Sequence, residues 1–171
     1  TLRMQAAHIK AQITKELWNQ TMGAFVAATE LESDRISVWG NAFAAESGLA
    51  APEQADAIYA LFRDHEADIF FEGQARWLPR PSFWNAPLSA PAPAPGAAMN
   101  SYQDGGFSAM PLRHILPFLG QRNHTMACRI LHDAVASFRS HGVNQWVGPF
   151  YPSMFSGGPG WLSSAAGAYE G

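Results

Sequence analysis

Residues 122–142 decide the predicted fold, and they read RNHTMACRILHDAVASFRSHG. Asn123 is a typical N-cap residue, and Gly142 follows Arg139 and His141, cations that suit the negative end of a helix dipole. Between these ends, apolar residues recur at spacings of three and four, on one helix face: Met126, Ile130, Leu131, Ala134, Val135 and Phe138. The stretch predicts an amphipathic helix packed against other helices.

Two helices are predicted at the start of the chain. Residues 3–31 are rich in good helix formers and contain no proline, and Ile9, Ile13 and Leu17 form an apolar row. Ser33-Asp34 is a capping signal for a helix over residues 35–47. One side of that helix carries Ile36, Trp39, Ala42, Phe43 and Glu46. A continuous helix over residues 3–47 is the alternative.

Further helices are predicted on either side of a proline-rich region. Pro52 suits the first turn of a helix over residues 52–73, where its missing N–H costs nothing. The apolar face of this helix comprises Ala55, Ile58, Tyr59, Phe62, Ile69 and Phe70. Residues 111–120 predict a short helix interrupted by Pro117.

Two segments have a different character and are predicted to form irregular arms, residues 78–110 and 143–171. Prolines are dense in the first, and residues 89–95, SAPAPAP, favour an extended polyproline-like conformation. A linker is the simpler interpretation of that repeat. However, aromatic side chains recur through both segments, as they do in arms that lie on a neighbouring surface. The candidate partner-binding residues are Trp77, Phe83, Trp84, Tyr102, Phe107, Trp146, Phe150, Tyr151, Phe155 and Trp161.

These elements define a fold class. We expect a mainly α protein: a small antiparallel helical bundle with long arms rich in proline, glycine and aromatic residues. The 171 residues suit a single domain, with a helical body over about 3–73 and 111–142.

Composition narrows the possible partners. Charged residues make up 15% of the chain against roughly 25% in typical proteins, while there are six Trp and eleven Phe. So many rings with so little charge indicate a protein-binding surface, in a homo- or hetero-oligomer. The net charge of −3 and the scattered basic residues give no indication of nucleic-acid binding.

The sequence also allows a prediction of where the protein is located in the cell. No apolar run approaches the roughly 20 residues of a transmembrane span, and the first twelve residues lack the apolar core of a signal peptide. A cytoplasmic protein, or one that is part of an assembled particle, is the expectation. The single cysteine, Cys128, excludes an intrachain disulfide.

One group of histidine and cysteine side chains suggests a metal site. His124, Cys128 and His132 are spaced by four on the predicted helix, and imidazole and thiolate groups suit zinc. The outer two lie about 12 Å apart along a helix, so only one adjacent pair can share an ion. Asp133 is expected on a different face from His132. The simpler interpretation is that Cys128 fills a gap in the core with histidines at its margin.

Other catalytic patterns are missing from the sequence. There is no Gly-x-Ser-x-Gly motif, phosphate-binding loop or dinucleotide fingerprint, and no cofactor is predicted. The acidic residues near His65 (Asp64, Glu66, Asp68 and Glu72) are interpreted as a solvated surface.

The sequence therefore predicts a non-enzymatic structural or accessory subunit of a larger assembly, such as a virion, a filament or a multi-subunit complex. Its arms would bind neighbouring subunits. A metal-dependent or thiol enzyme centred on His124, Cys128 and His132 is the alternative, and a third interpretation places the first helix on a lipid or polymer surface.

Overall fold

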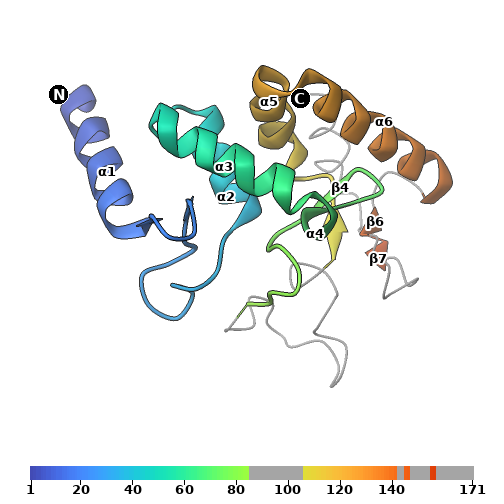
Figure 1. The fold of residues 1–171 in the computed structure, drawn as a ribbon, viewed down its shortest axis with the longest axis horizontal. Helices are drawn as coiled ribbons and strands as arrows, with labels where there is room; N and C mark the ends of the chain where they lie inside the picture. Colours follow the sequence, from blue (N-terminus) through green and yellow to red (C-terminus); the bar gives the residue numbers. More distant parts are fainter. Residues whose placement is uncertain (85–105, 142–144, 147–154, 157–171) are drawn as a thin grey trace.

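The computed structural model describes residues 1–84, 106–141, 145–146 and 155–156 (Figure 1). Within these ranges the chain is mainly α-helical, as predicted, with short antiparallel strands. In chain order the elements are α1 (Leu2–Leu17), β1 (Trp18–Asn19), β2 (Ala24–Phe25), α2 (Val38–Glu46), α3 (Pro52–Asp64), α4 (Glu66–Ile69), β3 (Phe70–Phe71), β4 (Gln74–Arg76), β5 (Phe107–Ser108), α5 (Leu112–Arg122), α6 (His124–His141), β6 (Gln145–Trp146) and β7 (Phe155–Ser156).

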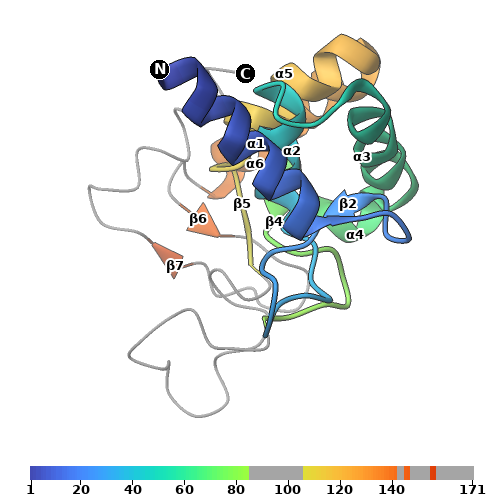
Figure 2. The same ribbon diagram turned by 90° about the vertical axis from the view of Figure 1, so that its left-hand side faces the viewer.

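The hydrophobic core lies among α2, α3, α5 and α6, and α5 packs against both α2 and α6. Phe62 on α3 and Phe118 on α5 meet edge to face, with ring centroids 5.8 Å apart. The apolar face predicted for α6 is confirmed: Met126, Ile130 and Ala134 are buried in this core. In Figure 1, α1 lies at the edge of this helical body, and Figure 2, which is viewed from that side, shows it in front of α2.

The first predicted helix is too long. Instead of continuing to residue 31, α1 ends at Leu17, and β1 and β2 form an antiparallel hairpin that pairs Trp18 with Phe25. The Asn19 side-chain oxygen accepts hydrogen bonds from the N–H groups of Thr21 and Met22, both at 3.0 Å, which stabilises the turn instead of a helix. The alternative of one continuous helix to residue 47 is wrong for the same reason.

The second helix begins later than predicted. Ser37, not Ser33 or Asp34, is the N-cap of α2, and its hydroxyl accepts a hydrogen bond from the Gly40 N–H at 3.0 Å. Asn41, which is 1% exposed, links α2 to the hairpin. Its side chain accepts from the Phe25 N–H and donates to the Phe25 carbonyl, both at 2.8 Å. This pair of bonds fixes the hairpin on the helix.

The third predicted helix is also interrupted. Pro52 opens α3 as expected, but α3 ends at Asp64, and after the short α4 the chain forms the β3–β4 hairpin. Glu72 and Gly73 form its turn, and both have positive φ, 49° and 70°. This is the backbone of a two-residue hairpin turn of type I′, which a helical pattern cannot accommodate.

α5 runs through Pro117 without a break, contrary to the predicted interruption. The ring removes one helical N–H donor, but the flanking Leu116 and Phe118 are buried, and this packing holds the helix together. At the start of α6, Asn123 is confirmed as the cap because its side-chain oxygen accepts from the Met126 N–H at 3.0 Å. Gly142 lies outside the described residues.

The described ends of the first arm pack on the body, so the arm does not begin at residue 78. Leu78 is buried, and the Phe83 carbonyl accepts a hydrogen bond from Arg35 Nε at 2.6 Å. At the other end, β5 pairs with β4 to complete a three-stranded antiparallel sheet in the order β3-β4-β5. Residues 85–105, and most of residues 143–171, lie outside the described part of the chain.

Candidate functional site

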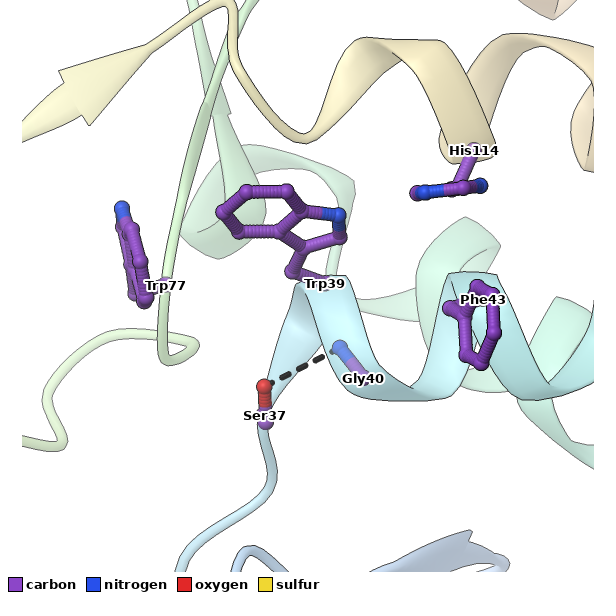
Figure 3. Close-up of a pocket in the computed structure, with 6 residues that line it drawn as sticks. All are labelled: Ser37, Trp39, Gly40, Phe43, Trp77 and His114. Atoms are coloured by element: carbon purple, nitrogen blue, oxygen red, sulfur yellow. Dashed lines mark hydrogen bonds between the residues drawn. The ribbon is translucent and has the colours of Figure 1, made fainter.

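The described surface carries a groove whose lining is largely aromatic, and we call it the aromatic groove. It has a volume of about 320 Å³ and lies beside α2, the start of α5 and the segment that follows β4 (Figure 3). Six residues line it: Ser37, Trp39, Gly40, Phe43, Trp77 and His114. None of them is an acid, a lysine or an arginine, so the groove favours an uncharged, apolar ligand.

One end of the aromatic groove is a corner between two indole rings. Trp39 and Trp77 meet edge to face, with centroids 5.1 Å apart and an interplanar angle of 83°. The Trp77 carbonyl accepts a hydrogen bond from the Val38 N–H at 2.8 Å, which holds the segment after β4 against the start of α2. The two rings are therefore fixed relative to each other by backbone as well as by ring contact.

The other end is a second corner, between Phe43 and His114, whose ring centroids are 5.1 Å apart at 79°. His114 Nδ1 lies 3.2 Å from Glu46 Oε2. Since an ionised carboxylate only accepts, Nδ1 carries the hydrogen in this contact, and Nε2 is left for other partners. Phe43 is 46% exposed, which is unusual for a phenylalanine on a helix next to the core.

The aromatic groove has few polar groups. Its polar groups are the Trp39 indole N–H, the His114 ring and the Ser37 hydroxyl, which already accepts from the Gly40 N–H. Figure 3 shows the Trp39 nitrogen turned toward His114. Within the described part of the chain, the side-chain hydrogen bond of His114 is the one to Glu46.

The predicted partner-binding residues differ in position and in burial. Trp77 lines the aromatic groove, whereas Phe107 is 2% exposed and belongs to the sheet, so its assignment to a partner surface is wrong. Phe83 and Trp84 are half-buried, and the guanidinium of buried Arg76 lies 4.8 Å from the Phe83 ring centroid. Tyr102, Phe150, Tyr151 and Trp161, and the side chains of Trp146 and Phe155, lie outside the described residues.

Sequence reasoning missed five of the six groove residues, among them the three rings of Trp39, Phe43 and His114. Their spacing of four places Trp39 and Phe43 on one side of the predicted helix. The spacing is real, but only the positions of Trp77 and α5 decide that these rings border an open groove rather than fill the core.

The histidine–cysteine constellation is partly assembled. His124 Nε2 lies 3.4 Å from Cys128 Sγ, so this adjacent pair meets as its spacing predicted. His132 instead lies 3.5 Å from Asp133, which corrects the expectation that those two diverge. Cys128 is exposed and does not fill the core. Among the described residues, no three His, Cys, Asp or Glu side chains are arranged to hold a metal ion.

The acidic residues near His65 form ion pairs at the surface. Glu66 pairs with Arg129 of α6 at 2.6 Å. Asp64 accepts two hydrogen bonds from its exposed neighbour Arg63, at 2.7 and 3.1 Å, and this contact lowers the pKa of the Asp64 carboxyl. These pairs stabilise the surface only slightly and leave no unusual charge for chemistry.

Two linked hydrogen bonds between side chains join the β3–β4 hairpin to α6. The sequence did not predict them. The Gln74 side-chain amide donates to the Ser137 hydroxyl at 3.1 Å, and that hydroxyl donates to a Glu72 carboxylate oxygen at 2.9 Å. Gln74 and Ser137 are buried, so the chain of bonds fixes the hairpin turn against the helix.

No described helix combines the length and the apolar character that crossing a membrane requires. No protein-family model, curated protein or solved structure matches this chain, so the functional argument rests on the aromatic groove and the exposed apolar surface themselves.

Proposed function

We propose that this protein is a non-enzymatic structural or accessory subunit of a larger assembly, such as a virion, a filament or a multi-subunit complex. Its helical body binds neighbouring subunits, and its proline- and aromatic-rich segments, within residues 78–110 and 143–171, act as extended arms. The neighbours are protein subunits, either further copies of this chain or other chains.

The observation that carries the proposal is the exposed apolar face of α1. None of the 16 residues of this helix is buried. Leu2 and Ile9 are 83% and 56% exposed. They continue the row of Ile13 and Leu17, which pack at the margin of the core. Isolated helices of this length are marginal in water, because most helical stability comes from packing an apolar face. A neighbour that covers Leu2 and Ile9 would supply that packing.

Composition gives independent support. The segments 78–110 and 143–171 contain three charged residues, Arg80, Asp104 and Glu170, together with many rings. Segments that stay in solvent have the opposite composition, with high charge and few aromatic residues. Segments with few charges and many rings are better accommodated against another protein.

The experiment compares self-association and stability of the wild type with those of Ile9→Ser. We expect concentration-dependent association of the wild type in sedimentation velocity, and weaker association of Ile9→Ser at an unchanged unfolding midpoint, because Ile9 is exposed and lies outside the hydrophobic core. Gln12→Ser, another exposed position on α1, is the matched control and should leave association unchanged. A wild type that stays monomeric at all concentrations, alone and in its native extract, would contradict the proposal.

Limited proteolysis tests the arms. We expect rapid cleavage within residues 85–105 and 143–171 of the dilute chain and protection after assembly. Equal protection of both segments in a demonstrated monomer is the contrary result.

A second candidate function, a metal-dependent or thiol enzyme, is favoured by the His124–Cys128 contact of 3.4 Å on an exposed helix face. Elemental analysis of the purified chain tests it. Stoichiometric zinc that is lost in His124→Ala supports this candidate, and a metal content that is the same in both proteins counts against it.

A further inference from the structure

We propose that the aromatic groove binds a small, uncharged, planar heterocycle that carries a cyclic amide, an N–H group next to a C=O group, on one edge. Uracil-type bases have this edge. The amide oxygen accepts a hydrogen bond from the Trp39 indole N–H, and the amide N–H donates to Nε2 of His114. This ligand site goes beyond the proposed assembly function and does not depend on it.

The arrangement of the rings suits a flat ligand. Figure 3 shows the Trp39 indole face on, between Trp77 and His114, and the Trp77 ring is nearly perpendicular to it, at 83°. The Trp39 face is therefore a floor, and Trp77 forms a wall beside it. On the other side, the Phe43 and His114 rings meet at 79°. A planar ring that lies parallel to Trp39 stacks on the floor and makes edge contacts with the walls.

The volume of the groove limits the size of this ligand. Pockets that hold drug-sized molecules have volumes of about 300–1,000 Å³. The aromatic groove, at about 320 Å³, is at the lower end of that range. It therefore suits a ligand of one ring or two fused rings.

Two polar groups of the groove form a donor and an acceptor. Because His114 Nδ1 donates to Glu46 Oε2 at 3.2 Å, Nε2 is the acceptor of a neutral ring. Glu46 does not line the groove, so it orients His114 from outside. The Trp39 indole N–H can only donate. Figure 3 shows its nitrogen turned toward His114, with no hydrogen bond between the two side chains.

A donor next to an acceptor selects a cyclic amide. In a ring the N–H and C=O groups of an amide are cis, so both lie on one edge of the ligand and meet both partners. A peptide bond is almost always trans and directs the two groups to opposite sides. A peptide backbone amide can therefore satisfy Trp39 or His114, but not both, and a missing bond costs about tenfold in affinity.

Charge distinguishes a free heterocycle from a base within a nucleic acid strand. A strand needs lysine or arginine next to its phosphates. None of the six residues that line the groove is lysine or arginine, and the net charge of the chain is −3. The groove therefore suits an uncharged ligand that brings no phosphate.

The first test uses small probes and the wild-type chain. 2-Pyridone carries the cyclic amide on a single ring, and N-methyl-2-pyridone is the matched control without the N–H. At about pH 8, where imidazole in water is uncharged, 2-pyridone should shift the NMR signal of the Trp39 indole N–H. That signal is identified by its loss in Trp39→Phe. We expect N-methyl-2-pyridone to bind about tenfold more weakly, and equal affinities would overturn the proposal.

The second test uses variants that keep a ring and remove its polar atom. Trp39→Phe and His114→Phe should each weaken 2-pyridone binding about tenfold, and His114→Phe should leave N-methyl-2-pyridone binding unchanged. Trp18→Phe is the matched control, because the Trp18 indole donates to Gln20 at 3.0 Å and does not line the groove. Equal binding of 2-pyridone to wild type and His114→Phe would contradict the role of Nε2. A variant that does not fold leaves the decision to the comparison of the two pyridones in the wild type.

The third test fixes the class of ligand. Propionamide has the same donor and acceptor without a ring, and it should bind more weakly than 2-pyridone. Equal binding would overturn the stacking on Trp39 and assign the groove to carboxamide side chains. Uridine should bind as well as an oligouridylate does per base. Tighter, salt-sensitive binding of the oligonucleotide would overturn the assignment to a free heterocycle.

Discussion

Gly73 lies directly against the backbone of Ala134, so closely that a Cβ atom added to Gly73 would lie 2.1 Å from the Ala134 amide nitrogen. The β3–β4 turn thus contacts the main chain of α6 with no side chain between them. Only glycine allows this approach, and it also accommodates the positive φ of 70° at this position.

Gly73→Ala should therefore be strongly destabilising. A left-handed conformation costs an alanine about 1–2 kcal/mol, and relieving a backbone clash adds about 1–3 kcal/mol. Gly48→Ala is the matched control, because Gly48 has φ of 74° with nothing within 4 Å of the added Cβ. Urea denaturation should show a loss of about 1–2 kcal/mol for the control and clearly more for Gly73→Ala. Equal losses would mean that the turn does not press on α6.

Asn41→Ala should destabilise the link between the hairpin and α2. The substitution leaves the buried N–H and carbonyl of Phe25 without their side-chain partner, at a cost of about 2–4 kcal/mol. Ser37→Ala removes one exposed cap bond on the same helix and should cost about 1 kcal/mol. Thermal denaturation of both variants checks the ranking, and a larger loss for Ser37→Ala would contradict it.

The amides of α1 should exchange with solvent much faster than those of α5. Opening α1 exposes only half-buried side chains such as Ile13 and Leu17, so its opening free energy is small, while α5 opens only with the core. Hydrogen exchange measured by mass spectrometry on a dilute sample checks this. Assembly should slow exchange in α1 selectively, and protection of α1 in the dilute monomer would be the contrary finding.

The Asp64 carboxyl should titrate below its ordinary pKa of 3.8, chiefly because Arg63 donates hydrogen bonds to the charged form. A pKa that is lower in the folded chain means that the contact stabilises the fold at neutral pH and that this contribution is lost as the pH falls below about 4. Both side chains are exposed, so the effect on stability is small. Carboxyl NMR should show the Asp64 pKa rising in Arg63→Met.

Cys128 should react with a thiol reagent such as DTNB in the folded chain at a rate close to that of the unfolded chain, because it is exposed on α6. Full protection until the protein unfolds is the outcome that would contradict the exposed position.

Local patterns in the sequence predicted the local features of the fold. The period of Met126, Ile130 and Ala134 gave the buried face of α6, and Asn123 gave its start, because both depend on residues within one or two turns. Prediction failed where distant residues decide the conformation. Residues 18–31 have a helical composition, yet Asn41, sixteen residues beyond Phe25, holds them as a hairpin.

The aromatic groove shows the same limit. The spacing of Trp39 and Phe43 identified a shared helix face, but whether that face is buried depends on Trp77 and His114, which are far along the chain. The sequence did not predict the Glu72-Gly73 turn, because Ile69 and Phe70 extend the helical period up to it and Glu-Gly is not one of the residue pairs that favour a type I′ turn, such as Asn-Gly or Asp-Gly.

The separation of α1 from the core has an evolutionary consequence. Leu2, Ala6 and Ile9 are exposed and lie outside the hydrophobic core. This face of α1 is therefore free to diverge and to acquire new binding preferences, while selection for a stable core acts mainly on α2, α3, α5 and α6.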